Sequence, residues 1–339
     1  MPTLKFKACG KRKVPFTAGH YAKAPIRITK FFKTRYGENP HQKGAFLIDP
    51  KNKDPLSIQN FKKPQRKEIS FNNLLDINTA LLTISELGGE KPSCVIIKHG
   101  NPCGAAYGKN PKEAFLRSWQ RGDSLAAFGS VIVINRPINE NVAKLMVKNF
   151  FEILLVPKVE KSALKIFSQK PNLIILINPA LKNPQPSKEI DIKKIRGGFL
   201  IQMPDLKEIR KKDLKVVTKI KPTKKQIRDL LFAWKICKVS KSNAIVLVKD
   251  ETIISSGVGQ QDRKRACQLA VIKAEEGAKN CIVASDGFFP FSDGPKILIK
   301  AGIKAIIQPG GSIRDKETIE LCNKYKISMV FTGIRCFHH

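Results

Sequence analysis

The chain has 339 residues, of which 42% are hydrophobic and 27% charged, and these values exclude a disordered or collagen-like protein. No apolar run approaches the roughly 18 residues of a membrane span, so a transmembrane protein is excluded and no membrane partner is expected. The 62 Lys and Arg exceed the 28 Asp and Glu by 34, but the cations are scattered along the chain. This scatter favours a basic, solubilising surface over a nucleic-acid-binding stripe.

The first half of the chain shows short apolar runs alternating with helical patterns. We expect strands at 94–97, 131–134 and 153–156 and helices at 113–120 and 140–151. A Pro- and Lys-rich stretch from 178 to 222 separates this half from the next. The alternation indicates an α/β unit.

The second half gives a clearer pattern. Thr223 is a candidate N-cap for a helix whose apolar residues, from Ile227 to Cys237, fall at helical spacing. We expect further helices at 262–276, 295–301 and 314–325, and strands at 243–248, 281–284, 305–308 and 327–331. Strands and helices in this order predict a mainly parallel sheet covered on both faces. The expected division is a basic N-terminal segment (1–34), a first α/β subdomain (35–180), a connection (181–222) and a second α/β subdomain (223–339).

The eight cysteines form no C-x-x-C pair, and several lie inside apolar runs. Buried free thiols in a reducing compartment are the expected state. No apolar signal region is present at the start of the sequence. The first 35 residues are rich in lysine but poor in serine, which does not favour an organelle presequence. A cytoplasmic location is therefore expected.

Ligands of α/β sheets bind where strands end, so the residues that follow each apolar run are candidates. Lys98 and His99 follow one run, and a neighbouring ammonium favours a neutral imidazole, which suits a base. Gly310-Gly311-Ser312 could expose backbone N–H groups to an anion, or could be a plain turn. A deaminase-type zinc site needs H-x-E and P-C-x-x-C, but His99 and Cys103 lack these partners, so no metal is expected.

Several segments together resemble AICAR transformylase, the C-terminal half of a bifunctional purine-biosynthesis protein. They occur in the family's order from about residue 35 to the last residue. The matching segments are 35–42 (RYGENPHQ), 98–104 (KHGNPCG), 127–130 (AFGS), 241–246 (KSNAIV), 259–263 (GQQDR), 285–291 (SDGFFPF), 308–312 (QPGGS) and 335–339 (RCFHH). The family usually has alanine where this chain has Gly287.

The resemblance implies two cytidine-deaminase-like α/β subdomains without zinc and a homodimer with active sites at the subunit interface. It implies formyl transfer from the co-substrate 10-formyltetrahydrofolate to the 5-amino group of AICAR. The cyclohydrolase half of the bifunctional protein is not in this sequence, so we expect no cyclohydrolase activity and a separate IMP cyclohydrolase as a possible partner.

The resemblance also implies roles for individual residues. His99 would be the general base, Lys98 its electrostatic and acid partner, and Asn243 an orienting donor, while His339 would contact the nucleotide amide. The residues implied in AICAR binding are Arg35, Tyr36, His99, Gly129, Glu152, Asn243, Arg263, Phe288 and Arg335. Those implied in folate binding are Lys264, Asp293, Ser312 and Ile313.

Two other functions compete with this interpretation. The net charge of +34 would suit a nucleic-acid-binding protein that reuses an old enzyme fold. An enzyme using formate and ATP would need a phosphate loop, and no Gly-x-x-x-x-Gly-Lys motif is present.

Overall fold

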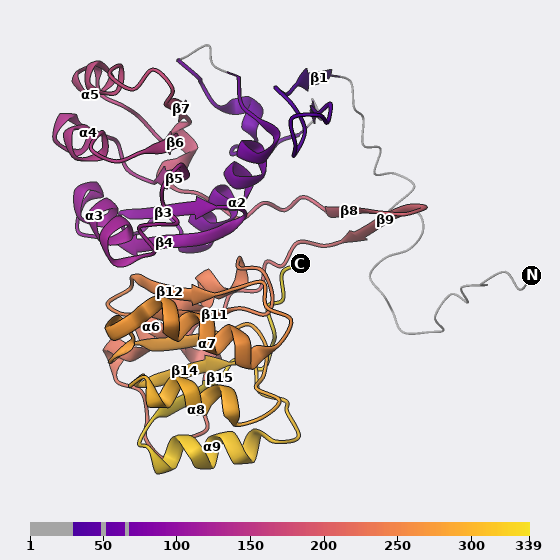
Figure 1. Cartoon of the computed structure of the whole chain (residues 1–339), viewed down its shortest axis with the longest axis vertical. Coiled ribbons are helices and arrows are strands. Elements are labelled where there is room, and N and C mark those ends of the chain that lie inside the picture. The colour runs from indigo at the N-terminus through magenta and orange to yellow at the C-terminus, as the bar shows by residue number, and fades with distance from the viewer. Residues whose placement is uncertain (1–29, 49–51, 65–67) are drawn as a thin grey trace, which may run out of the picture.

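The structure, a computed structural model, describes residues 30–48, 52–64 and 68–339. Most of the basic segment expected over 1–34 therefore lies outside the described residues. Figure 1 shows two sheets, each with its own helices, and a two-stranded hairpin that projects from the body between them.

The first sheet has the strand order β4-β3-β5-β6-β7. Strands β5, β6 and β7 run parallel, whereas β3 is antiparallel to both of its neighbours. The strands are β3 (Ser93–Lys98), β4 (Asn101–Tyr107), β5 (Ser130–Ile134), β6 (Phe151–Val156) and β7 (Ile174–Ile177), and the helices are α2 (Phe71–Leu87), α3 (Pro111–Arg121), α4 (Glu140–Met146) and α5 (Lys161–Phe167).

The second sheet has the order β10-β15-β14-β13-β11-β12, with β13, β14 and β15 parallel and the other pairs antiparallel. The strands are β10 (Lys215–Val216), β11 (Ile245–Val248), β12 (Ile253–Gly257), β13 (Ile282–Ser285), β14 (Ala305–Gln308) and β15 (Ser328–Phe331), and the helices are α6 (Lys224–Lys238), α7 (Arg263–Ala274), α8 (Asp293–Lys300) and α9 (Asp315–Lys324).

The two units repeat one element order. A helix, two antiparallel strands and three helix–strand pairs follow one another from α2 to β7 and again from α6 to β15. The strand orders also correspond, except for the added edge strand β10. The α/β prediction with parallel central strands is confirmed, and the antiparallel hairpin at one edge of each sheet is the feature that the pattern did not predict.

Buried side chains explain how the layers hold together. Helices α3 to α5 cover one face of the first sheet, and α7 to α9 cover one face of the second. The remaining face of each sheet packs with α2 and α6 into a single core shared by both units. Edge strands β4 and β12 also meet, where the Tyr107 N–H donates to the Glu251 carbonyl at 3.1 Å. The units are therefore joined by packing along a continuous seam.

Local signals account for the start of both shared helices. Ser70 and Thr223 each accept a backbone N–H three residues on, in capping boxes that open α2 and α6. The expected helix over 140–151 is wrong in its second half: α4 ends at Met146. Phe151 instead opens β6, because its backbone pairs with Ser130 of β5.

The connection contains more structure than its composition suggests. Strands β8 (Asp191–Ile195) and β9 (Gly198–Gln202) form the projecting hairpin of Figure 1. Phe199 and Leu200 are 60% and 57% exposed. A second short hairpin joins β1 (Lys30–Lys33) to β2 (Ala45–Ile48). Short 3-10 turns occupy Ile58–Asn60, Pro179–Lys182, Lys211–Asp213 and Glu275–Ala278.

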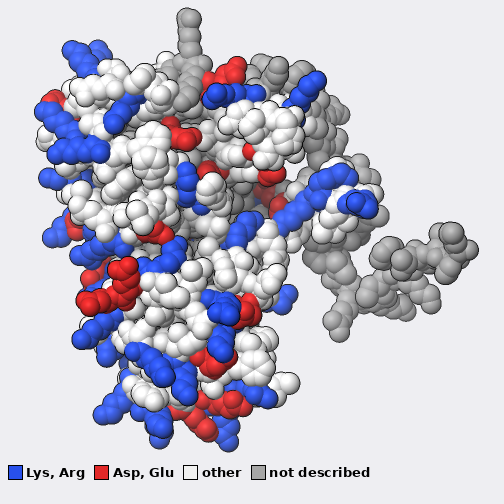
Figure 2. Space-filling view, in the orientation of Figure 1, with Lys and Arg blue, Asp and Glu red and all other residues white. Residues whose placement is uncertain are grey.

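Charge is distributed over the visible face without a single basic stripe. Figure 2 shows Lys and Arg side chains on both units, with Asp and Glu side chains among them. This agrees with the scatter in the sequence. No helix in the described part of the chain is long and apolar enough to cross a membrane.

Candidate functional site

Lys98 and His99 lie at the turn of the β3–β4 hairpin. His99 and Gly100 both have positive φ, at 50° and 71°, as a two-residue hairpin turn of this hand requires. Asp76 of α2 fixes the turn by accepting the Gly100 N–H at 2.6 Å. Burial raises the pKa of the Asp76 carboxyl, opposed by this hydrogen bond and by the charges of His99 and Lys98. Asp76 is not among the residues predicted from the sequence, because it lies on α2, a helix that was not predicted.

Lys98 belongs to a compact group with Gly129, Glu152 and Asn73. Its Nζ donates to the Gly129 carbonyl at 2.9 Å. Gly129 has a φ of 67°, and a Cβ there would lie 3.1 Å from Lys98 Nζ and 3.6 Å from Glu152 Oε1. Asn73 of α2 donates to Glu152 Oε2 at 3.0 Å. The glycine therefore lets the ammonium and the carboxylate share one recess.

In the first unit, the residues that follow the strands do not all lie at the same edge of the sheet. Because β3 is antiparallel to β5, its carboxyl end meets the amino ends of the parallel strands β5 and β6. Asn135, which follows β5, lies at the opposite end of the sheet. Its side chain accepts the Ser93 N–H and donates to the carbonyls of Gly88 and Lys91, which is a structural role.

A second group lies at the carboxyl ends of the parallel strands of the other sheet. Arg263, the first residue of α7, is 7% exposed and forms an ion pair with the fully buried Asp286. Its Nη2 donates to Asn243 Oδ1 at 2.7 Å. Asn243 Nδ2 already donates to the carbonyls of Gln260 and Gln261, at 2.7 and 3.1 Å. For Asn243 to donate to a ligand, one of these backbone bonds must be exchanged.

The two groups meet along the seam between the units. Asn101, which follows the His99 turn, donates from Nδ2 to the His99 carbonyl at 3.2 Å. Its Oδ1 accepts the Lys241 N–H at 3.0 Å, two residues before Asn243. One side chain therefore links the turn that carries Lys98 and His99 to the loop that carries Asn243.

The C-terminal tail, residues 335–339, lies against the second group. Arg335 stacks over Phe337 with its guanidinium carbon 4.7 Å from the ring centre, and Phe337 contacts His339 at 5.9 Å between ring centres. A Cβ on Gly287 would lie 2.6 Å from Arg263 Nη2 and 2.7 Å from the Phe337 ring. The space of the family's alanine methyl is thus filled by these two side chains.

The comparisons with known proteins follow this geometry. Residues 7–273 match the family model described as AICARFT/IMPCHase bienzyme. Proteins named bifunctional purine biosynthesis protein PurH are similar to this chain, with 40% identity in Magnetococcus marinus, 43% in Acetivibrio thermocellus and 42% in Caldicellulosiruptor saccharolyticus, over 93%, 93% and 94% of the chain. The chain belongs to the AICARFT/IMPCHase family.

The similarity covers nearly all of this chain but less than two thirds of each relative. The chain spans 60% of the Magnetococcus and Acetivibrio proteins and 61% of the Caldicellulosiruptor protein. Several of the residues that the AICARFT/IMPCHase resemblance singled out fall into the two groups described above. Lys98, Gly129 and Glu152 lie together beside the His99 turn, and Asn243 and Arg263 lie with the tail that carries Arg335 and His339.

The residues predicted to face folate form a separate set on the second unit. Lys264 and Asp293, at the starts of α7 and α8, form an ion pair at 3.7 Å. Ile313 is fully exposed. The N–H groups of Gly311 and Ser312 donate to Asp315 Oδ2, at 2.7 and 3.1 Å. The chain's own carboxylate thus occupies the candidate anion site, which corrects that hypothesis.

Arg35 and Tyr36 stand apart from the other predicted site residues. Arg35 is exposed and lies over the Tyr36 ring at 5.7 Å. Their segment is tied to α2 by Asn72, whose Nδ2 donates to the Glu38 carbonyl at 3.1 Å. Among the described residues, neither side chain bonds to another predicted site residue. Phe288 is also exposed, at 44%, whereas its neighbour Phe289 is buried in the core.

The pH dependence of stability tests the packing of the tail. Burial, together with the ammonium groups of Lys241 and Lys193, lowers the pKa of His338 from 6.5 to about 4. Between pH 6.5 and about 4, His338 is protonated in the unfolded chain but not in the folded chain. The free energy of unfolding should therefore fall as the pH drops from about 6.5 towards 4. We expect His338→Gln to flatten the fall in Tm over this range. Parallel Tm curves for the two proteins would contradict the prediction.

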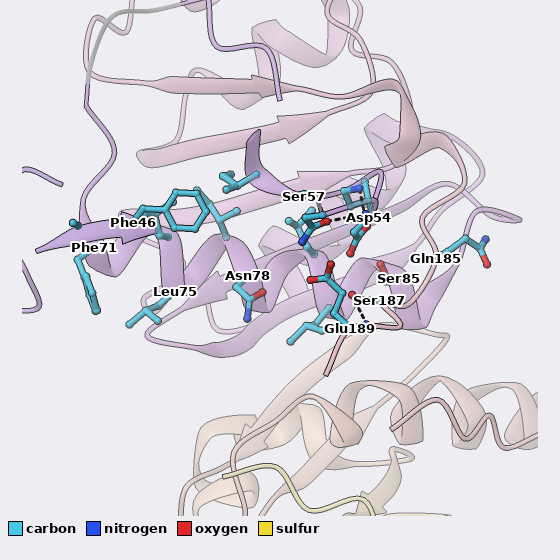
Figure 3. A pocket seen from close by; sticks show the side chains of 18 residues that line it. Phe46, Asp54, Ser57, Phe71, Leu75, Asn78, Ser85, Gln185, Ser187 and Glu189 are labelled. Atoms are coloured by element: carbon cyan, nitrogen blue, oxygen red, sulfur yellow. Dashed lines mark hydrogen bonds between the residues drawn. The ribbon is translucent and has the colours of Figure 1, made fainter. Parts of the chain in front are cut away.

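A separate cavity of about 410 Å³ lies on another side of α2. Figure 3 shows Phe46, Phe71, Leu75 and Asn78 around it, with Glu189 beside Ser187 toward its other end. None of the predicted site residues lines it, so it is not the candidate site. The described residues hold no group of three or more His, Cys, Asp or Glu side chains placed to bind a metal ion.

Proposed function

We propose that this chain transfers a formyl group from 10-formyltetrahydrofolate to the 5-amino group of AICAR, giving FAICAR and tetrahydrofolate in purine biosynthesis. The observation that carries the proposal is the seam. There Asn101 links the turn that carries Lys98 and His99 to the loop that carries Asn243, in a chain that belongs to the AICARFT/IMPCHase family. The proposal includes a cytoplasmic location, which the seven buried free cysteines of the described residues support.

The chemistry asks for three actions, and the site offers a group for each. The attacking amine is a poor nucleophile and must lose a proton, for which His99 at the exposed turn is the proposed general base. The tetrahedral intermediate carries negative charge, which the Lys98 ammonium would stabilise. The folate nitrogen must gain a proton as it leaves, and Lys98 is also the proposed acid. His339, in the tail beside Phe337, would contact the nucleotide amide.

The nucleotide would be held by guanidinium groups that remain exposed. Arg35 and Arg335 both stack on an aromatic ring and present donors suited to a phosphate. Glu152 and Gly129 lie beside Lys98, and Arg263 is bonded to Asn243; all four would contact the nucleotide. Phe288 would cover the base, and Lys264, Asp293, Ser312 and Ile313 would face the folate.

We propose that the site is completed in a homodimer. Residues 199–201 of the β8–β9 hairpin are consecutive apolar residues, so both faces of the ribbon are apolar. A lone two-stranded hairpin is marginally stable in water, so a partner surface is needed to cover these faces. The hairpin touches the proposed site, since Lys193, the middle residue of β8, donates from Nζ to the His339 carbonyl at 2.9 Å. A second copy on the hairpin would therefore approach the tail.

Arg35 gives a direct test of the nucleotide site. Because its guanidinium is exposed and forms no ion pair with a described residue, Arg35→Ala should leave the fold intact. We expect the KM for AICAR to rise by about 10-fold or more, as loss of a charge-assisted phosphate contact implies, with a smaller effect on kcat. Arg314→Ala is the control, since Arg314 also stacks on an exposed ring, that of Phe291. An unchanged KM in the Arg35 variant would remove it from the site.

The net charge supports one competing function, a nucleic-acid-binding protein. The face shown in Figure 2 does not favour it, because Asp and Glu side chains lie among the Lys and Arg side chains there and interrupt a basic surface. A mobility-shift assay at physiological salt distinguishes the two. Tight duplex binding would favour the competitor, and weak, salt-labile binding would not.

The proposed function is tested by following tetrahydrofolate formation with AICAR and 10-formyltetrahydrofolate. We expect turnover that requires both substrates and yields no IMP, because we propose that ring closure belongs to a cyclohydrolase outside these 339 residues. No turnover by the intact, folded dimer would reject the proposal. IMP formation would show that these 339 residues also carry out ring closure, and would reject the proposal that another cyclohydrolase does so.

A further inference from the structure

We propose that Asp286 is a positioning residue that holds Arg263, Asn243 and the C-terminal tail in one fixed arrangement. Its carboxylate is fully buried and so does not itself touch a ligand. The kinetic part of this inference rests on the proposed formyl transfer, whereas the structural part is tested without activity.

Three donors converge on the Asp286 carboxylate. Oδ1 accepts from Arg263 Nη1 and from the Ala244 N–H at 3.1 Å, and Oδ2 accepts from the Ser242 hydroxyl. These donors come from the start of α7 and from the loop before β11, which are separate in the sequence. In a buried site of low dielectric, such charge-assisted bonds are strong and directional. The carboxylate therefore sets where both segments lie.

The same residue also holds the tail. The Asp286 carbonyl accepts the Cys336 N–H at 3.0 Å. Ser242, which Asp286 orients, donates its N–H to the His338 carbonyl at 2.9 Å, and its Oγ accepts the His338 N–H at 3.4 Å. Arg335 and His339, proposed to contact the nucleotide, flank these anchored residues. Asp286 is thus bonded, directly or through Ser242, to every segment of the second group.

Two side-chain interactions connect Asp286 to the proposed reaction centre. Arg263, paired with Asp286, directs Nη2 to Asn243 Oδ1 and so fixes the plane of the amide. Without the carboxylate, a buried guanidinium would lack its counter-charge and would seek another partner. The amide of Asn243 would then lose its orientation as well.

The decisive variant is Asp286→Asn, which preserves shape but offers one acceptor oxygen where the carboxylate offers two. It cannot accept from Arg263, Ala244 and Ser242 together. We expect kcat/KM for formyl transfer to fall about 100-fold, as for a misplacement of about 1 Å in a catalytic site. We also expect faster hydrogen–deuterium exchange at the amides of Cys336 and His338.

Asp229→Asn is the matched control. Asp229 is 4% exposed and accepts the N–H groups of Asp250 and Glu251, at 3.2 and 2.7 Å. Neither hydrogen bond involves a residue of the tail. It should lower Tm by loss of buried bonds but leave tail exchange and kcat/KM near the wild-type values. If Asp286→Asn does not fold, Ser242→Ala removes one of the three donors and should give the same tail exchange with a smaller kinetic loss.

The outcomes separate the two proposals. Unchanged tail exchange in the folded Asp286→Asn variant, or in Ser242→Ala where the former does not fold, would overturn the positioning role. So would an equal kinetic loss in the Asp229 variant at equal Tm. If the wild type transfers no formyl group, the proposed function falls, but the exchange comparison still decides whether Asp286 holds the tail.

Discussion

Replacing His99 with asparagine should lower kcat by about 10²- to 10⁴-fold, the range associated with loss of a general base. Asparagine is the suitable substitute because it tolerates the left-handed backbone that residue 99 adopts, with a φ of 50°. AICAR affinity should change little, since a base acts on the transition state and not on the bound ground state. Steady-state kinetics and a calorimetric titration of AICAR measure the two quantities.

The repeated fold supplies a control for this variant. Asp250 lies in the equivalent turn of the second unit, between β11 and β12, and also has a positive φ, at 56°. Asp250→Asn alters this turn and also removes the ion pairs of Asp250 with Lys225 and Arg121, so it should cost stability while kcat remains near the wild-type value. If the His99 variant keeps a tenth or more of wild-type activity, His99 is not the base.

The pair of substitutions Phe199→Asp and Leu200→Asp should convert the proposed dimer to a monomer and reduce formyl transfer by about 100-fold. Both side chains are more than half exposed in the single chain, so the charges should cost its fold little. In the proposed dimer they would be buried against a partner, where unpaired carboxylates are strongly unfavourable. Sedimentation velocity measures the mass, and the tetrahydrofolate assay measures the activity.

Ile272→Asp is the control for surface charge, because Ile272 is an apolar side chain, 70% exposed, on α7. We expect that variant to remain dimeric and active. A hairpin variant that stays dimeric would exclude β8–β9 as the contact. A monomer with full activity would show that each chain holds a complete site.

Hydrophobic periodicity predicted the strands whose residues are uniformly buried. It failed where backbone pairing with a neighbouring strand decides between helix and strand. The run Val131–Ile134 lies in the centre of a sheet, so its composition is that of a buried strand. Phe150 and Phe151 suit a helix as well as a strand, and pairing with β5 decides for β6. Helix α2 was missed although Ser70 gives it a capping box and apolar residues recur at helical spacing.

The candidate site shows the same division. Lys98, His99 and Asn243 could be named because motifs carry them. Asp76 could have been found from the pattern of α2, one turn after Asn73. The convergence of Ser242, Arg263 and the tail on Asp286 has no local signal, because the three segments meet only in the folded chain. Such a hub follows from tertiary contacts alone.

The most direct test of the account is transfer of isotopic label from the formyl carbon of 10-formyltetrahydrofolate to AICAR, with the His99→Asn variant in parallel. We predict labelled FAICAR from the wild-type protein, formed in equal amount with tetrahydrofolate, and almost none from the variant. Absence of labelled FAICAR after incubation with the folded wild-type protein would contradict the central claim. Equal labelling by both proteins would leave the reaction but remove His99 from it.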